Sequence, residues 1–263
     1  MQSARIAELL QPFLSPCHFG ERGDEESAVL SQTQLHSIST YIDILLHWSA
    51  RINLTAIRDP EEIVTRHFGE SLFAARHLFP TTAHVGTAAL GCPAERSSAD
   101  REGRDFSRAD SRLEKGIGAL APGGRAARLA DVGSGAGFPG LPIKLWAPNI
   151  ALTLIESNQK KATFLHEVSR ALKLTKINIQ NARAETLTPS TFDVVTLRAV
   201  ERFPDVLPVA AALLTSSGRL ALLIASSQLD QARSSLPHLF WQPPIPVPES
   251  RSRLLLVGTQ EPA

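Results

Sequence analysis

The sequence predicts an α/β fold in which a mostly parallel β-sheet is covered by helices on both faces. From residue 128 onward, short apolar runs alternate with segments of helical periodicity roughly 10 to 15 residues long. The first of these runs ends in a glycine-rich turn that leads into a helix. With 263 residues and 43% hydrophobic content, the chain can bury a substantial core. No apolar run approaches the roughly 20 residues of a membrane-spanning helix.

Residues 1–80 are expected to form a helical extension that packs on the sheet. The first ten residues have an amphipathic pattern and lack the apolar block of a signal peptide. A second helix is indicated by apolar residues at helical spacing, namely Ile38, Tyr41, Ile42, Leu45 and Trp48.

A third helix is predicted to begin at Asp59. This aspartate is placed to cap the helix, Pro60 suits the first turn, and the acids that follow face the positive end of the helix dipole. Further along, His67 falls on the side that we expect to be buried. A satisfied, partly buried histidine is favoured over a catalytic one.

Residues 81–127 are expected to form a flexible insertion between the extension and the core. The segment is rich in Gly, Ala, Ser and Arg and has few large apolar residues. Such a composition cannot bury enough apolar area to offset the entropy of ordering. An arm that grips RNA is the less favoured alternative, because the charge of the segment is close to neutral.

Residues 128–263 are expected to form the sheet and its helices. Strands are predicted at 128–132, 151–155, 176–180, 192–197, 218–225 and 252–259. Helices are predicted at 139–147, 158–172 and 202–214 and near 227–235. The proline-rich run 242–248 is a poor central strand and is expected to be a connection or an edge strand. In such sheets, ligands bind at the carboxyl ends of the strands.

The glycine-rich turn after the first predicted strand carries the strongest functional signal. Glycines stand at Gly133, Gly135 and Gly137, and Asp131 precedes them by two residues. Glycine lets a ligand approach the backbone closely, and the helix that follows offers its positive end to the ligand. A dinucleotide-binding fingerprint needs its third glycine where this chain has Phe138. The spacing resembles instead the first motif of class I S-adenosylmethionine-dependent methyltransferases.

Glu156 ends the next apolar run and is a candidate for holding a ribose. Its carboxylate can accept hydrogen bonds from both hydroxyls of the sugar diol. Two alternatives stay open at this point: a plain tight turn, and a nicotinamide dinucleotide site, which also places an acid roughly 20 residues further on.

Charge and cysteine content narrow the classes of protein to which the chain could belong. The net charge is +1, so the whole chain has no basic signature of nucleic-acid binding. A local surplus of Lys and Arg between residues 141 and 202 could meet phosphates, although an ordinary solvated helix face is favoured. The two cysteines, Cys17 and Cys92, form neither a disulfide framework nor a metal-ligand cluster. We therefore expect a cytoplasmic protein without a metal site.

Several motifs resemble those of the RsmG (GidB) family of bacterial 16S ribosomal RNA (guanine-N7) methyltransferases. They are Asn53-Leu54-Thr55-Ala56-Ile57-Arg58-Asp59-Pro60, Arg66-His67-Phe68-Gly69-Glu70-Ser71-Leu72, the run from Asp131 to Pro142, Lys160-Lys161-Ala162-Thr163-Phe164-Leu165, and Leu197-Arg198-Ala199. The resemblance covers nearly the whole chain except 82–127. It implies a class I, Rossmann-like fold with a seven-stranded sheet, S-adenosylmethionine as cofactor, and the small ribosomal subunit as partner.

The resemblance also implies roles for particular residues. The cofactor-binding candidates are Gly133, Gly135, Gly137, Phe138, Glu156, Ala184, Glu185 and Arg198. Arg198 is in addition the candidate for positioning the target base. The resemblance also points to Arg183 as a contact with RNA, and Arg66 and Lys144 are further candidates for RNA contact. Nothing in the sequence demands an oligomer, so a monomer is expected.

The chain departs from the family pattern at two places. Glu70 stands where the family usually has aspartate, and Ile224-Ala225-Ser226 replaces a Lys-Gly step, which puts one RNA or substrate contact in doubt. Two other functions remain as alternatives: a methyltransferase acting on another RNA or a small molecule, and a non-catalytic ribosome-binding module. No catalytic acid–base pair is evident, which agrees with alkylation of guanine N7, because this nitrogen has a free lone pair and no proton.

Overall fold

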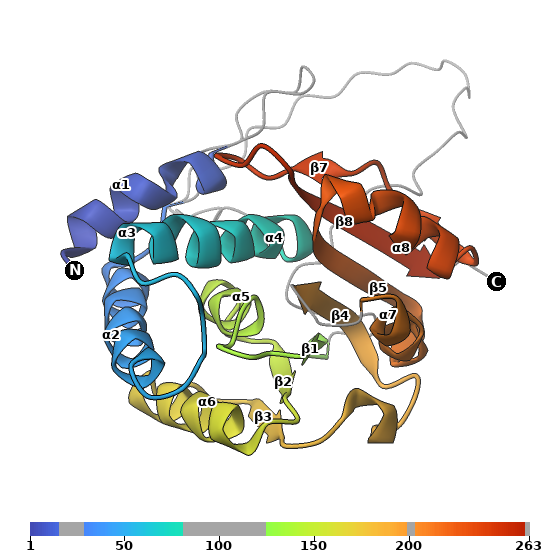
Figure 1. Cartoon of the computed structure of the whole chain (residues 1–263), viewed down its shortest axis with the longest axis horizontal. Coiled ribbons are helices and arrows are strands. Elements are labelled where there is room, and N and C mark those ends of the chain that lie inside the picture. Colours follow the sequence, from blue (N-terminus) through green and yellow to red (C-terminus); the bar gives the residue numbers. More distant parts are fainter. Residues whose placement is uncertain (16–28, 81–124, 199–202, 261–263) are drawn as a thin grey trace, which may run out of the picture.

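The computed structural model describes residues 1–15, 29–80, 125–198 and 203–260. Its centre is one twisted β-sheet (Figure 1). The strands are β1 (Arg128–Val132), β2 (Ala151–Ile155), β3 (Ile177–Gln180), β4 (Phe192–Arg198), β5 (Leu214–Ala225), β6 (Leu239–Trp241), β7 (Ile245–Pro246) and β8 (Arg253–Gln260). The order across the sheet is β3-β2-β1-β4-β5-β8-β6, and β7 also pairs with β8.

The helices are α1 (Ser3–Leu14), α2 (Gln32–Ser49), α3 (Pro60–Glu62), α4 (Glu70–Leu78), α5 (Gly140–Trp146), α6 (Gln159–Ala171), α7 (Phe203–Ala212) and α8 (Leu229–Ser235). A π-helical segment, η1 (Ile63–Gly69), joins α3 to α4. Short 3-10 turns are η2 (Ala184–Thr186) and η3 (Ser226–Gln228). None of the helices in these described ranges has the length and apolar content needed to cross a membrane.

The sheet confirms the predicted architecture. Strands β1 to β5 are parallel, while β8 runs antiparallel between β5 and β6. Seven positions across the sheet therefore hold eight strands, because β6 and β7 pair with different parts of β8. The proline-rich run supplies only the two residues of β7, at this edge, where a missing backbone N–H is tolerated.

The predicted boundaries fail where backbone geometry overrides the apolar pattern. The third strand begins at Ile177 and not at Lys176, because Lys176 has a φ of 54°, which a strand does not accommodate. The helix predicted to reach residue 214 ends at Ala212, since Leu214 already pairs with Phe192 as the first residue of β5. The three-residue strand β6 was not predicted.

Each face of the sheet buries its own hydrophobic cluster. Successive residues of a strand point to opposite faces. In β1, accordingly, Leu129 packs on the side of α5 and α6, while Ala130 and Val132 pack on the side of α7 and α8. The helices on the two faces thus hold the carboxyl ends of the parallel strands in a fixed frame.

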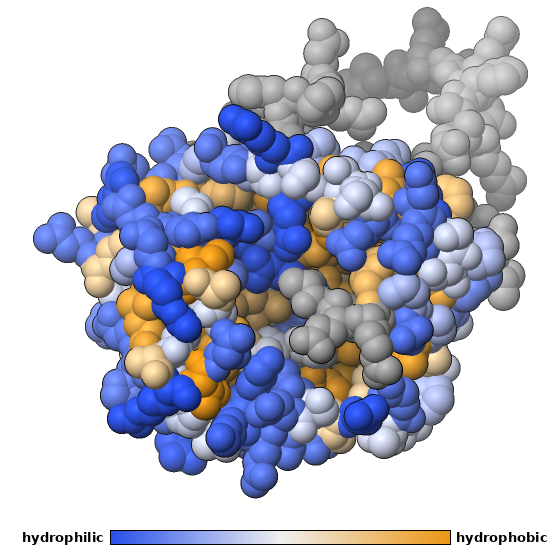
Figure 2. Space-filling view, in the orientation of Figure 1, coloured by the Kyte–Doolittle hydropathy of each residue, from blue (hydrophilic) through white to orange (hydrophobic). Residues whose placement is uncertain are grey.

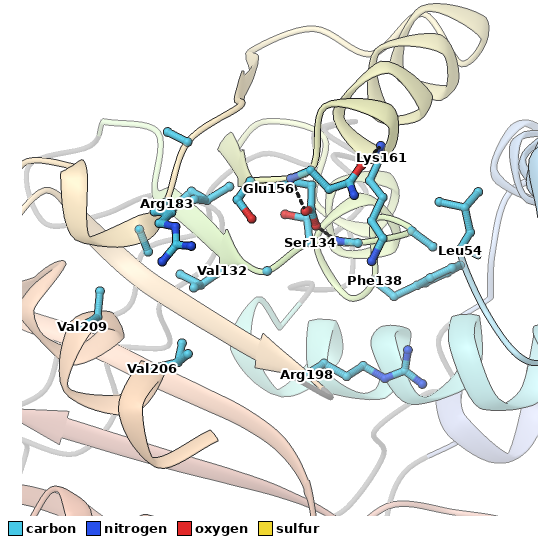
Figure 3. Close-up of a pocket in the computed structure, with 18 of the residues that line it drawn as sticks. Leu54, Val132, Ser134, Phe138, Glu156, Lys161, Arg183, Arg198, Val206 and Val209 are labelled. Carbon is cyan, nitrogen blue, oxygen red and sulfur yellow. Dashed lines mark hydrogen bonds between the residues drawn. The ribbon is translucent and has the colours of Figure 1, made fainter. Parts of the chain in front are cut away.

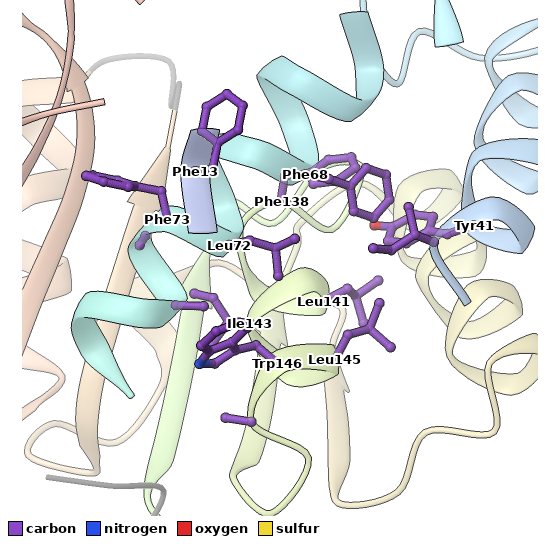
Figure 4. Packing of buried hydrophobic residues seen from close by; sticks show 14 of the residues in the cluster. Phe13, Tyr41, Phe68, Leu72, Phe73, Phe138, Leu141, Ile143, Leu145 and Trp146 are labelled. Atoms are coloured by element: carbon purple, nitrogen blue, oxygen red, sulfur yellow. The ribbon is translucent and has the colours of Figure 1, made fainter. Parts of the chain in front are cut away.

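The N-terminal helices form a further layer over α5 and α6 (Figures 1 and 4). Trp146 of α5 donates its indole N–H to the Phe79 carbonyl at 2.8 Å, and Gln34 of α2 donates to the Leu145 carbonyl at 2.9 Å. The predicted face of α2 is buried, although Trp48 remains partly exposed. The predicted insertion 81–127 lies outside the described residues except for its last three, and of these Ala127 is buried in the core.

The predicted helix start at Asp59 is confirmed. The Asp59 carboxylate accepts a hydrogen bond from the Glu62 N–H at 2.8 Å, and Pro60 occupies the first turn. What the sequence did not predict is η1, the π-helical stretch that follows. Such wide turns in helices frequently occur at functional sites. Here η1 and the first residue of α4 present His67 and Glu70 to the end of β4.

Candidate active site

A pocket of about 700 Å³ lies at the carboxyl ends of β1, β2 and β4. The space-filling view shows this face hollowed near its centre, with apolar residues inside and hydrophilic residues around the rim (Figure 2). Within the hollow, Leu54, Phe138 and Lys161 lie on one side, and Arg183, Val206 and Val209 lie on the other (Figure 3). The size suits a small-molecule ligand or cofactor.

The floor of the pocket is the glycine loop that follows β1. Gly133, Gly135 and Gly137 all have positive φ, of 69°, 52° and 85°. The N–H groups of Gly133 and Ser134 donate to the Ile155 carbonyl at 2.9 and 3.1 Å, which ties the loop to the end of β2. A Cβ added at Gly135 would approach only the Gly133 carbonyl, at 3.7 Å, so the loop is open toward the pocket at this point.

Gly137 is required for packing beneath the loop. A Cβ there would overlap the Tyr41 hydroxyl and would lie 2.6 Å from Leu141 Cδ1. We expect Gly137→Ala to lower the free energy of unfolding by about 2–4 kcal/mol, since strain at positive φ adds to overpacking. Urea unfolding measures this loss. The matched change Gly135→Ala shares the strain without the overlap, and an equal loss in both variants would contradict the packing argument.

Glu156 links the glycine loop to the start of α6. Its Oε2 accepts from the Gly135 N–H at 2.9 Å, and its Oε1 accepts from the Asn158 N–H at 2.8 Å. Each carboxylate oxygen keeps a further lone pair. Because Glu156 also lines the pocket, those lone pairs are placed to accept from the hydroxyls of a ligand.

Asp131 supports the loop from below and does not line the pocket. Thr196 donates its hydroxyl to Asp131 Oδ1 at 2.9 Å, and the Gly140 N–H donates to Oδ2 at 3.1 Å. Burial raises the pKa of the Asp131 carboxyl to about 7. The two hydrogen bonds from Thr196 and Gly140 join β1 to β4 and to the first turn of α5.

Arg198, the last residue of β4, is held by a buried network. It donates to Glu70 Oε2 from Nε at 3.3 Å and from Nη2 at 3.0 Å, and Nη2 also donates to the Arg66 carbonyl at 2.7 Å. Its Nη1 lies 3.1 Å from His67 Nδ1. Arg253 of β8 donates to the same oxygen of Glu70 at 3.3 Å. Four of the five N–H groups of Arg198 are thus engaged within the protein.

His67 occupies the centre of this network and faces the pocket. Burial, together with the positive charges of Arg198, Arg66 and Arg253, lowers the pKa of its imidazole to about 3. The neutral ring stacks on Phe138, with centroids 4.8 Å apart, and Phe138 in turn stacks on Tyr41 at 5.3 Å. Figure 4 shows the second of these ring pairs, Phe138 beside Tyr41. The buried histidine favoured from the sequence thus also forms part of the pocket wall.

The low pKa of His67 predicts a pH-dependent stability. Between pH 3 and 6.5 the unfolded chain binds a proton at this ring and the native protein does not, so stability falls as the pH drops below about 6.5. The free energy of unfolding should fall between pH 7 and pH 5 in the wild type. In His67→Gln this fall should be smaller by about 1–2 kcal/mol. Urea unfolding at both pH values tests this, with His36→Gln, at an exposed position, as the control. An identical loss in wild type and His67→Gln would contradict it.

Most of the site residues predicted from the sequence line one pocket. They are Gly133, Gly135, Phe138, Glu156, Arg183, Ala184, Glu185 and Arg198. Gly137 lies under the loop instead. Arg66 is exposed, pairs with Glu62 at 2.9 Å, and faces a second, smaller cavity that it shares with Arg253.

Lys144 must be corrected as a candidate for RNA contact. It is 1% exposed, and its Nζ donates to the carbonyls of Pro148 and Ile150 at 2.7 and 2.6 Å. Burial lowers the pKa of its ammonium to about 8. The side chain folds back to satisfy the turn between α5 and β2, so it cannot reach a partner at the surface.

Other lining residues were not singled out from the sequence as site residues. They include Leu54, Thr55, Asn158, Lys161, Val206 and Val209. A signal existed for three of them: Leu54 and Thr55 lie within the N-terminal motif, and Lys161 follows Glu156 by five residues on the first turns of α6. The valines of α7 had only the pattern of core residues.

Comparison with known proteins gives one consistent result. A family model described as rRNA small subunit methyltransferase G matches residues 34–94 and 118–240 and leaves 95–117 unmatched. The chain is 34% identical over 194 residues to ribosomal RNA small subunit methyltransferase G of Desulfitobacterium hafniense, covering 72% of this chain and 62% of that protein. It is 30% identical over 210 residues to the protein of the same name from Xylella fastidiosa, covering 80% of this chain and 77% of that one. The matched region therefore spans less than two thirds of the first relative and about three quarters of the second.

Proposed function

The chain belongs to the rRNA small subunit methyltransferase G family, and from this premise we propose that it methylates N7 of a guanine in 16S ribosomal RNA with S-adenosylmethionine as the methyl donor. Family membership supports a methyltransferase that acts on the RNA of the small subunit. The choice of guanine N7 is the finer part of the proposal and rests on the resemblance of the sequence motifs. We further propose that the protein works as a monomer in the cytoplasm.

The pocket fits the cofactor on chemical grounds. The glycine loop leaves room above Gly135 for a ligand to approach the backbone. The Glu156 carboxylate is fixed by two backbone N–H groups and still offers lone pairs to the ribose hydroxyls. Ala184 and Glu185, in the turn η2, line the part of the pocket that the adenine would occupy. When bound, S-adenosylmethionine supplies a methyl group made electrophilic by its sulfonium.

The acceptor needs no base from the protein. Guanine N7 carries a lone pair in the ring plane and no proton, so the nitrogen can attack directly. The contribution of the protein is then to hold the acceptor in line with the methyl group, which can lower the barrier by several kcal/mol. The neutral, engaged state of His67 is consistent with this role, since the ring is held by contacts on both nitrogens.

The N-terminal segments supply the wall that the substrate base would meet. Leu54, Thr55 and His67 come from outside the sheet domain, and they line the pocket beside Phe138 and Arg198. Proteins that read RNA commonly take unstacked bases onto aromatic or guanidinium planes. We therefore place the guanine against this wall and the cofactor over the glycine loop.

The observation that carries the proposal is this joining of two parts in one pocket: a glycine loop with a fixed Glu156, and a second wall from the motif that resembles the family most specifically. The test incubates the protein with labelled S-adenosylmethionine and small ribosomal subunits that lack N7-methylguanine. The RNA is then cleaved chemically at N7-methylguanine. Label at a single guanine is the expected result. Cofactor binding without methyl transfer would contradict the proposed RNA substrate. Absence of cofactor binding would contradict the whole proposal.

A further inference from the structure

The hydrogen-bond directions around His67 can be assigned from chemistry alone. The guanidinium of Arg198 carries N–H donors and no acceptor, and arginine stays protonated in proteins. At the 3.1 Å contact, Arg198 Nη1 therefore donates and His67 Nδ1 accepts. Because Nδ1 accepts, it carries no proton, and the single proton of the ring lies on Nε2. The imidazole is thus fixed in one tautomer.

This tautomer fixes the hydroxyl of Thr55 in turn. His67 Nε2–H donates to Thr55 Oγ1 at 2.8 Å, and the Ile57 N–H donates to the same oxygen at 3.1 Å. A hydroxyl oxygen has two acceptor lone pairs, and both are now in use. The Thr55 hydroxyl can therefore act only as a donor. Among the residues that the structure describes, no acceptor for it is found, and Thr55 lines the pocket.

We propose that the Thr55 hydroxyl recognises the target guanine by donating a hydrogen bond to its O6. This assignment rests on the proposed function. O6 is an acceptor on the same base edge as N7, whereas adenine presents an amino donor at the matching position. A hydroxyl that can only donate forms a hydrogen bond with guanine O6. With adenine, the same hydroxyl would face the amino group, and two donors would meet without an acceptor. Thr55 is thus a specificity-determining residue, and Arg198 and His67 are positioning residues that act through it.

The surroundings of Thr55 support an acceptor from the base rather than from the cofactor. Thr55 belongs to the wall formed with Leu54 and His67, while Glu156 and the glycine loop provide the contacts that suit a nucleoside. Two further features hold the donor in place. The His67 ring is stacked on Phe138, and Arg198 is anchored by Glu70, whose side chain is 4% exposed.

The first test compares Thr55→Val, which removes the hydroxyl at nearly constant shape, with Thr55→Ser, which keeps it. The kcat/KM for methyl transfer to small subunits should fall about 10- to 100-fold in Thr55→Val and recover to within about threefold of wild type in Thr55→Ser. The dissociation constant for S-adenosylmethionine should stay unchanged in both. Thr163→Val, at an exposed position of α6, is the control.

The second test removes the proposed partner. Small subunits are assembled with 2-aminopurine in place of the target guanine, which keeps N7 and lacks O6. The wild-type protein should lose about as much kcat/KM on this substrate as Thr55→Val loses on guanine, and Thr55→Val should lose little more. Penalties that multiply would overturn the assignment, because the two groups would then act independently.

Three other outcomes have distinct meanings. Unchanged transfer by Thr55→Val, with active wild-type protein, would overturn the assignment alone. A weaker affinity for S-adenosylmethionine with normal transfer at saturation would overturn it in favour of a cofactor contact. Absence of transfer by the wild-type protein would refute the proposed function, and the assignment would fall with it.

Discussion

Arg198→Ala is expected to reduce methyl transfer about 100-fold and to lower the free energy of unfolding by about 2–4 kcal/mol. The stability loss arises because the buried Glu70 carboxylate loses its pairing with Arg198 and, among the described residues, keeps that with Arg253. The loss of transfer arises because His67 loses the donor that fixes its tautomer, so the Thr55 hydroxyl is no longer held as a donor toward the pocket. Single-turnover transfer and urea unfolding measure the two effects.

The controls separate positioning from general damage. Arg233→Ala changes an exposed arginine on α8 and should leave both quantities as in wild type. The double variant of Arg198→Ala with Thr55→Val should be about as slow as Arg198→Ala alone, because both changes act on one hydroxyl. Losses that multiply would show that Arg198 acts on the substrate independently of Thr55. A stable variant with wild-type transfer would remove Arg198 from the site altogether.

Glu156→Ala is expected to weaken binding of S-adenosylmethionine by at least about 100-fold. The variant loses the charged acceptor for two ribose hydroxyls, and each hydrogen bond to a charged group contributes about 1.5–3 kcal/mol. It also frees the Gly135 and Asn158 N–H groups that hold the loop and the first turn of α6 in place. Isothermal titration calorimetry gives the affinity directly.

A matched control for this loss is Glu167→Ala, which removes an exposed acid from α6 and should bind the cofactor like wild type. Thermal unfolding of both variants shows whether the fold is intact. An affinity of Glu156→Ala within about threefold of wild type would contradict the assignment of Glu156 to the ribose, whatever its effect on stability.

The parallel strands β1, β2 and β4 were predictable because most of their residues are buried. Such strands are continuous apolar runs, and the residues of β1 and β2 were predicted with the bounds that the structure gives them. Strand β6 has only three residues, of which one is buried, so its apolar run is too short to predict a strand. The early start of β5 at Leu214 depends on its pairing with Phe192, which is information that a local pattern does not hold.

The candidate site likewise has one part that could be predicted from local sequence and one part that could not. The cofactor side is nearly local, since Gly135 and Glu156 are 21 residues apart and each follows its own strand. The opposite wall depends on the pairing of Glu70 with Arg198, which lies 128 residues further along. Arg198 was a predicted site residue, but this pairing was not predicted. Lys144 shows the converse error: it was counted with the Lys and Arg surplus of residues 141–202, but its side chain folds back onto two carbonyls.

The pairing of Glu70 with Arg253 has a consequence for the newborn chain on the ribosome. Arg253 is added 183 residues after Glu70, which at about 5–20 residues per second is a delay of roughly 10–40 s. During that interval the carboxylate that anchors the opposite wall lacks its contact with Arg253. A polypeptide released before β8 is therefore expected to have an incompletely anchored wall where the acceptor would rest. Translation through β8 becomes the step that completes this wall.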